Sequence, residues 1–242
     1  MHSCLDTRVE GNIIYCNDTS WRTRVFKNRF EAGEKLALFL LDQGIGGEGI
    51  VFGLAAGGVP VAYSVAKILG CLMDILVVKK ITFPWTTEAG FGAVAINGSY
   101  DYDEFLAHAY LKYTEEQVAG LARHVHEYVV ARTKRLRGKT EYDKLDGRRV
   151  VLVDDGIATG YTMIVGVRFL KKLGAASVIA AAPTASSDGA RLVAREADKV
   201  VVLNLRHPPY AVADAYEEWH DVSDEEVIDI LEKAGKDKIL LF

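Results

Sequence analysis

The chain of 242 residues carries 29 Lys and Arg against 33 Asp and Glu, a formal net charge of −4, and half of its residues are apolar. This composition is typical of a globular protein and excludes collagen-like and disordered chains. The longest apolar runs, at 36–41 and 178–182, are far shorter than the roughly 20 residues of a membrane span. Residues 1–6 have neither the basic nor the apolar region of a secretion signal. We therefore expect a cytoplasmic protein without a membrane partner, and its acidity argues against a nucleic-acid partner.

Three cysteines, Cys4, Cys16 and Cys71, are an odd and scattered set without the spacing of metal ligands. In a cytosolic protein such cysteines are normally reduced. We expect three free thiols.

The pattern of apolar residues predicts strands that alternate with helices. In chain order we expect a helix over 29–41, a strand over 50–54, a helix over 60–69, a strand over 74–79, a loop with a short hairpin over 81–100, a long helix that begins near Thr114 and ends before Gly138, a strand over 150–153, a helix over 161–173, a strand over 177–182, a helix over 188–196, a strand over 199–203, and a final helix capped by Ser223. This alternation predicts one α/β domain over 1–242, with a doubly wound, mostly parallel sheet flanked by helices. Ligands of such sheets bind at the C-terminal ends of the strands.

The most informative segment runs from Asp154 to Thr162, directly after the apolar strand. Two adjacent carboxylates end the strand, and a turn of small residues leads into a helix. Such a turn presents backbone N–H groups and a helix N-terminus to one point, which suits a phosphate. The Thr159 and Thr162 hydroxyls add donors, and carboxylates accept hydrogen bonds from vicinal hydroxyls. A sugar phosphate is the ligand that this combination indicates, although paired Asp at a strand end can also be simply solvated.

This segment resembles the signature of type I phosphoribosyltransferases. Further similar pieces follow the order of one poorly assigned branch of that family, at 30–33, 53–62, 77–81 and 223–227. The resemblance implies an enzyme that uses 5-phosphoribosyl-1-pyrophosphate (PRPP) and Mg²⁺, transfers phosphoribosyl to a small-molecule nitrogen acceptor, and releases pyrophosphate. It also implies a homodimer and a small hood over the site, formed by the terminal segments 1–30 and 206–242.

The resemblance assigns roles to the residues of the signature. Asp154 and Asp155 would be catalytic and would hold the ribose hydroxyls, directly or through the Mg²⁺ shell. The 5-phosphate would be wrapped by Gly156, Ile157, Ala158, Thr159, Gly160 and Thr162.

Pyrophosphate is expected at the loop after the first buried strand, formed by Ala55, Ala56, Gly57 and Gly58. The branch that the chain resembles usually has Pro-Arg where this chain has Ala55-Ala56. Without that arginine, pyrophosphate would depend more on backbone amides, Mg²⁺ and Lys79 or Lys80. Successive strand residues face opposite sides, so only one lysine should reach the site. We expect Lys80 to be the catalytic one.

The signature also bears on the acceptor. Hypoxanthine–guanine enzymes have an Asp base where this chain has Ala158, so 6-oxopurine transfer by that route is not expected. Adenine-like, pyrimidine-like or orotate-like acceptors and a non-nucleobase amine stay open. Tyr210, Tyr216 and Trp219 either line the acceptor pocket or pack structurally. The many acids between Asp214 and Asp229 are most simply a solvated surface.

Two further segments have alternative readings. Residues 82–100, which include Pro84, Trp85, Glu88, Gly90 and Gly92, form either a mobile lid or an ordinary hairpin. A basic cluster at the end of the long helix has three alternative roles: it offsets the helix dipole, it recruits pyrophosphate, or it contacts RNA. The cluster consists of Arg132, Lys134, Arg135, Arg137 and Lys139. Contact with RNA belongs to the alternative function, a PRPP-sensing regulator that binds nucleic acid. A third candidate function is a ribose-phosphate hydrolase or phosphorylase.

Overall fold

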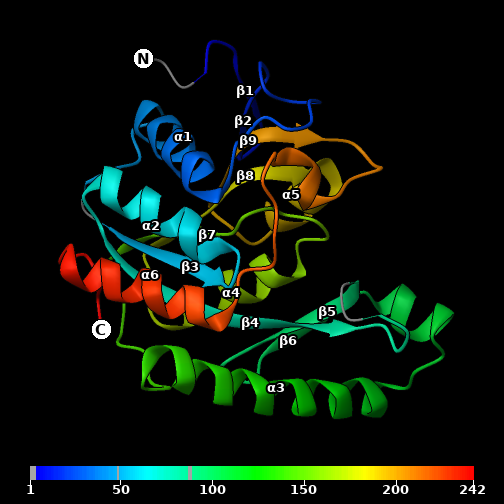
Figure 1. The fold of residues 1–242 in the computed structure, drawn as a ribbon. Coiled ribbons are helices and arrows are strands. Elements are labelled where there is room, and N and C mark those ends of the chain that lie inside the picture. The colour runs from blue at the N-terminus through cyan, green and yellow to red at the C-terminus, as the bar shows by residue number, and fades with distance from the viewer. Residues whose placement is uncertain (1–3, 48, 87–88) are drawn as a thin grey trace.

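The computed structural model describes residues 4–47, 49–86 and 89–242, and this part of the chain forms one nine-stranded sheet (Figure 1). Its strands are β1 (Thr7–Glu10), β2 (Ile13–Cys16), β3 (Ile50–Ala55), β4 (Leu72–Thr82), β5 (Gly90–Ala95), β6 (Tyr100–Tyr102), β7 (Arg149–Val153), β8 (Ser177–Ser186) and β9 (Lys199–Arg206). They lie in the order β1-β2-β9-β8-β7-β3-β4-β5-β6. The strands from β2 to β4 are parallel, and β1, β5 and β6 add antiparallel edges. The expected mostly parallel α/β sheet is confirmed.

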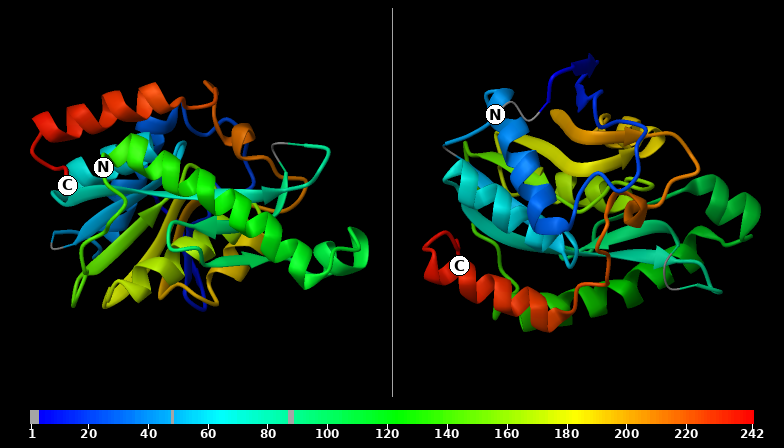
Figure 2. Two further views of the ribbon diagram at one scale, coloured as in Figure 1. Left: turned by 90° about the horizontal axis from the view of Figure 1, so that it is seen from below. Right: turned by 45° about the horizontal axis from the view of Figure 1, so that its top comes forward.

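Helices cover both faces of this sheet. They are α1 (Arg29–Asp42), α2 (Gly58–Leu69), α3 (Glu115–Arg137), α4 (Tyr161–Lys172), α5 (Ser187–Val193) and α6 (Asp224–Lys236), with a π-helical turn η1 (Phe105–Tyr110) and a 3₁₀ turn η2 (Val212–Ala215). A Cβ on Gly53 of β3 would lie 2.8 Å from the Cβ of Ala62 in α2, whereas a Cβ on Gly166 of α4 would meet side chains that include Leu54. Consecutive residues of β3 thus face α2 and α4, so these helices cover opposite faces. Helix α6 lies along α2 and α3 (Figure 2).

The connections of β3 and β7 define where a ligand can bind. These two strands are neighbours, yet β3 continues through α2 to β4 on one side, and β7 continues through α4 to β8 on the other. The loops after β3 and β7 therefore diverge at the carboxyl edge of the sheet. Such a topological switch point is the usual ligand crevice of an open α/β sheet.

The helices begin and end near the expected residues, and the strands run longer. Thr114 and Ser223 each form a complete capping box, as their sequence patterns predict. Helix α2 begins two residues before Pro60, and α5 ends at Val193 rather than 196. Strands β8 and β9 extend to residues 186 and 206 because they pair with each other along that length.

The segment 81–100 contains the expected hairpin, but β4 itself runs on to Thr82 and pairs with β5. This extension has a small apolar core of its own, formed by Ile81, Phe91, Val94, Ala107, Val118 and Ala122. Trp85 is exposed. Glu88 lies outside the described residues, and the movement of a lid stays a prediction.

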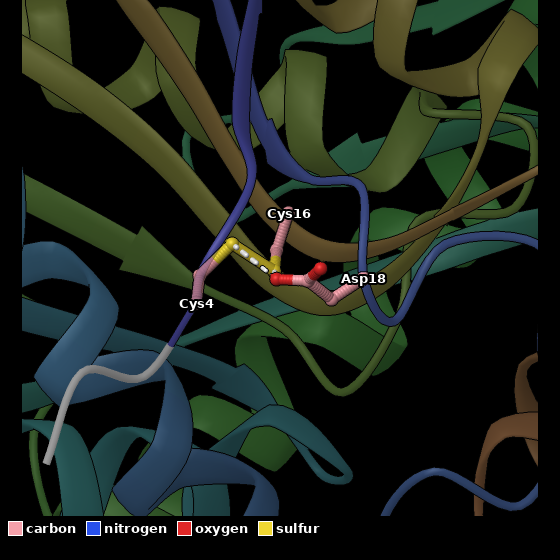
Figure 3. Close-up of side chains that lie close together, drawn as sticks. All are labelled: Cys4, Cys16 and Asp18. Carbon is pink, nitrogen blue, oxygen red and sulfur yellow. Dashed lines mark hydrogen bonds between the residues drawn. A yellow bond between two sulfur atoms is a disulfide. The ribbon is translucent and has the colours of Figure 1, made fainter.

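The expectation of three free thiols is wrong for two of them. The short hairpin of β1 and β2 brings Cys4 and Cys16 together as a disulfide, and Cys71 is a buried free thiol. Figure 3 shows the carboxylate of Asp18 beside the two sulfurs. Its Oδ2 accepts hydrogen bonds from the backbone amides of Leu5 and Asp6, at 2.6 and 2.8 Å. Asp18 therefore closes the turn that carries Cys4.

None of the described helices is long and apolar enough to cross a membrane.

Candidate functional site

The loop between β7 and α4, residues 154–160, is fixed to the end of the neighbouring strand β8. The amide of Ile157 donates to the carbonyl of Thr184 at 3.0 Å, and the amide of Ser186 donates to the carbonyl of Ile157 at 2.8 Å. Ser186 also caps α5 through a bond to the amide of Gly189. These bonds set the conformation of the loop, so its remaining amides are pre-organised.

The N-terminus of α4 is open to an anion. Gly160 is the N-cap residue at φ 94°, no side chain caps the helix, and its first turn has no acidic residue. Within the described part of the chain, the amides of Ala158, Thr159 and Gly160 make no hydrogen bond. Uncapped amides at a helix N-terminus bind phosphate readily. That this loop binds a 5-phosphate stays a prediction.

The acidic pair lies at the C-terminal end of β7. The amide of Asp155 donates to Oδ1 of Asp154 at 2.9 Å. Burial raises the pKa of Asp154 well above its usual range, and the negative charge of Asp155 raises it further. The positive charge of Lys80 acts in the opposite direction. Two carboxylates in such an environment attract a cation or hydroxyl donors.

The loop after β3 touches both acids. A Cβ on Gly57 would lie 2.0 Å from Oδ2 of Asp155, and a Cβ on Gly58 would lie 2.6 Å from the carbonyl oxygen of Val153. Glycine is required at both positions for this approach. The Ala55–Ala56 peptide before them is cis. The two loops that the sequence singles out, 55–58 and 154–162, therefore meet at the switch point.

The two lysines at the end of β4 face opposite sides, as the strand alternation predicts. Nζ of Lys79 lies 5.3 Å from the ring centroid of Tyr128 in α3. Lys80 instead lies near enough to Asp154 for its charge to lower the pKa of that carboxyl. Lys80 is the lysine on the side of the acidic pair.

Segments from both termini lie over the site. The hydroxyl of Tyr216 donates to the carbonyl of Asp155 at 2.6 Å, and the hydroxyl of Tyr210 is 3.4 Å from Oγ1 of Thr184. A Cβ on Gly156 would lie 2.5 Å from a methyl group of Val212, so η2 rests directly on the loop between β7 and α4. The segment before α1 pairs with this tail through the bond from the amide of Phe26 to the carbonyl of Ala215, at 3.0 Å. These contacts bring parts of both terminal segments together beside the loop after β7, and a hood formed by 1–30 and 206–242 stays a prediction.

One residue of the site escapes sequence reasoning. Arg29 is almost fully buried, and its Nε donates to Oδ2 of Asp155 at 2.8 Å. The sequence marks it only as the start of a helix, yet a cation in the first turn of a helix opposes the helix dipole. That mismatch is the one signal that could have identified it.

The basic cluster at the end of α3 is largely paired. Arg132 bonds Asp224, Arg135 bonds Asp224 and Glu225, and Arg137 bonds Asp74, which is buried on β4. The expectation of a simply solvated acidic tail is therefore wrong at the start of α6, where acids hold α6 against α3.

A family model described as "Phosphoribosyl transferase domain" matches residues 24–215. Two curated relatives from Mycobacterium tuberculosis strains, named "Putative phosphoribosyl transferase Rv0571c" and "Putative phosphoribosyl transferase MT0597", are each 34% identical over 217 residues, 88% of this chain and 48% of theirs. The chain thus spans about half the length of the curated relatives it matches. The crystal structure of TT1426 from Thermus thermophilus is 32% identical and has a TM-score of 0.69, with 86% of this chain and 98% of that chain covered.

Proposed function

Because the chain belongs to the phosphoribosyl transferase family, we propose that it transfers the phosphoribosyl group of PRPP to a nitrogen acceptor and releases pyrophosphate. One observation carries this proposal. The uncapped N-terminus of α4, the acidic pair and the glycine loop after β3 converge at one switch point of the sheet. The first suits a 5-phosphate, the second a ribose, and the third a pyrophosphate.

In the proposed reaction the acceptor nitrogen bonds to C1 of the ribose as the bond from C1 to the pyrophosphate oxygen breaks. The free amides of 158–160 hold the 5-phosphate, and Asp154 and Asp155 accept hydrogen bonds from the ribose hydroxyls. Lys80 offsets the charge that develops on the leaving pyrophosphate beside residues 55–58. No covalent step involves the protein, so orientation and charge stabilisation supply the rate enhancement.

The residues present suit Mg²⁺. Adjacent carboxylates are hard oxygen donors, and burial together with the negative charge of Asp155 raises the pKa of Asp154, so a cation beside this carboxyl would favour its charged form. Asp154 and Asp155 would hold the ion together with pyrophosphate oxygens. When bound, it supplies charge neutralisation for the leaving group.

The acceptor is proposed to bind beneath the hood. Ala158 provides no general base, so we do not propose hypoxanthine or guanine by an Asp-base route. Adenine-like, pyrimidine-like and orotate-like bases and a simple amine are the candidates. Tyr210 and Tyr216 belong to this hood, where their hydroxyls contact Oγ1 of Thr184 and the carbonyl of Asp155. We further propose, from the family resemblance, that the protein is a homodimer; the cytoplasmic location that the sequence analysis expects stays a prediction.

The regulator alternative gains no support from the fold. Its nucleic-acid surface would be the basic cluster, and three arginines of that cluster pair with acids of α6 and β4. Binding to RNA at low salt that weakens steeply with added salt would restore it.

Calorimetric titration of PRPP with and without Mg²⁺ tests the proposal. We expect metal-dependent binding that Asp154→Asn/Asp155→Asn abolishes and that Asp188→Asn, a change at an exposed acid of α5, leaves unchanged. Pyrophosphate release is then measured across the candidate acceptors. Binding of ribose 5-phosphate without any response to PRPP would refute transfer from PRPP, and release of ribose 5-phosphate and pyrophosphate from PRPP without an acceptor would identify a hydrolase.

A further inference from the structure

Arg29 makes three contacts at once from a buried position. Nε donates to Oδ2 of Asp155 at 2.8 Å, Nη1 donates to the carbonyl of His220 at 2.8 Å, and the guanidinium carbon lies 3.9 Å from the ring centroid of Trp219. Only 6% of its side chain is exposed. The first contact reaches the acidic pair and the other two reach the hood.

Nothing about α1 itself explains an arginine at this position. The residue begins the helix, where Asn28 already supplies the cap through a bond to the amide of Glu31. A positive charge there is opposed by the helix dipole. A buried guanidinium is also costly unless its charge and its N–H groups are satisfied. Its partners, rather than the helix, must account for its presence.

Asp155 is held from two directions by the same segment of the tail. Tyr216 donates to its backbone carbonyl at 2.6 Å, and Trp219 and His220 hold Arg29, which holds its carboxylate. The oxygen that accepts from Arg29, Oδ2, also lies against Gly57. The orientation of Asp155 therefore depends on the position of residues 216–220.

We infer that Arg29 is a positioning residue, which fixes the carboxylate of Asp155 for the ribose and makes that orientation depend on the hood. The inference rests on the proposed function, because it assigns Asp155 to the ribose of PRPP. Arg29 itself touches neither the ribose nor the pyrophosphate in this assignment. The edges of its planar guanidinium donate hydrogen bonds to a carboxylate and a carbonyl, and its face packs on an indole ring. A lysine ammonium cannot satisfy all three.

The chain contains a matched control in Arg137. Its Nε donates to Asp74 at 2.8 Å, its Nη1 donates to the carbonyl of Glu141 at 2.8 Å, and its guanidinium carbon lies 3.8 Å from the ring centroid of Tyr142. Like Arg29, Arg137 thus contacts a carboxylate, a backbone carbonyl and an aromatic ring. Asp74, however, lies near the start of β4, at the opposite end of the strand from Lys80.

The experiment compares Arg29→Lys and Arg29→Met with Arg137→Lys and Arg137→Met, using melting temperature and steady-state pyrophosphate release. Both pairs should lower the melting temperature. Only the Arg29 variants should raise KM for PRPP and lower kcat/KM, by about tenfold to a hundredfold for a displaced catalytic group. Lysine should retain more activity than methionine. PRPP titration of each folded variant should follow the same order.

Two results would overturn the inference. If the Arg29 variants lose stability but keep KM and kcat/KM within twofold of the wild type, the residue is only structural. If the Arg137 variants raise KM as much as the Arg29 variants, the effect reports general loosening of the fold. In both cases an active wild type leaves the proposed function standing. A wild-type protein that neither binds PRPP nor releases pyrophosphate would overturn the proposed function and this inference together.

Discussion

Asp154 and Asp155 are neighbours in the chain, yet their carboxylates lie in different surroundings. Asp155 has a buried arginine at 2.8 Å. Asp154 has no such partner at that distance among the described residues, and its pKa is raised because it is partly buried beside a second acid. A carboxyl whose environment opposes its charged form weakens the fold at neutral pH. Such a residue is typical of a functional site rather than of a structural one.

We expect Asp154→Asn to stabilise the protein at neutral pH and to abolish binding of PRPP. The folded state holds the proton of Asp154 more tightly than the unfolded chain, whose pKa is near 3.8. Protonated Asp154 therefore contributes fully to the stability of the folded state below pH 3.8. This contribution is lost as the pH rises through the raised pKa that Asp154 has in the folded state. Asparagine carries no charge and so removes the cost of holding a charged carboxylate at this position. Each kcal/mol gained should raise the melting temperature by about 2–4 °C. Thermal melts from pH 4 to pH 8 test this, and a lower melting temperature of the variant at pH 8 would contradict it.

Gly57→Ala should weaken PRPP binding by moving Asp155. The φ of Gly57 is −59°, so its backbone tolerates alanine, but the new Cβ would lie 2.0 Å from Oδ2 of Asp155. The carboxylate must swing away or the loop must shift. Gly166→Ala is the control, because its Cβ would lie 2.8 Å from a methyl group of Leu152, inside the core. We expect lower stability with unchanged affinity for Gly166→Ala, and reduced affinity for Gly57→Ala. Equal affinities of the two variants would argue against the assignment of the loop.

Among the elements, those with a local signal follow the sequence, and those fixed by distant pairing do not. The capping boxes at Thr114 and Ser223 predict the starts of α3 and α6 correctly. Strands β1 and β2 have four residues each, and β1 is exposed along its length, so no periodicity marks them. The length of β4 is set by its pairing with β5.

The same division applies to the site. Loop 154–162 and loop 55–58 combine a strand end with a turn of small residues. Strand alternation predicts that Lys79 and Lys80 face opposite sides, but not which of them faces the acidic pair. Arg29 and Tyr216 are far from this signature in the chain. Their contacts with Asp155 exist only because the segments before α1 and after β9 pair over the site.

At the scale of elements, α3 and α6 are joined by a group of ion pairs that centres on Asp224. Arg132 and Arg135 both contact this carboxylate, and the side chains of Arg132 and Asp224 are 14% and 16% exposed. Asp224→Asn should cost about 1–2 kcal/mol, since it leaves a half-buried guanidinium without its charge partner. Glu225→Gln, at a side chain 72% exposed, should change stability by less than about 0.5 kcal/mol. Urea unfolding measures both, and equal losses would show that burial does not govern these pairs.

The whole molecule places its chemistry through topology rather than through one motif. Parallel strands bring the loops after β3 and β7 to the same edge, and the opposite directions of their crossovers open the crevice between them. The strands added at the two edges of the sheet do not carry the loops of the site. Strands β5 and β6 extend one side of the sheet over their own small core, and β1 and β2 close the other side with a disulfide. Both additions lie outside the neighbouring parallel strands β3 and β7 whose loops meet at the site.

The disulfide makes the stability of the molecule dependent on redox conditions. Cys4 and Cys16 are 12 residues apart, and closing a loop of about this size restricts the unfolded chain enough to stabilise a protein by about 2–3 kcal/mol. We expect the wild type to lose this amount in urea unfolding when a reductant is added, and Cys4→Ser to unfold like the reduced wild type under both conditions. Cys71→Ser is the control, because this buried thiol takes no part in the bridge. It should keep the response to reductant. A wild type with identical unfolding curves in the presence and absence of reductant would show that the bridge adds nothing to the fold.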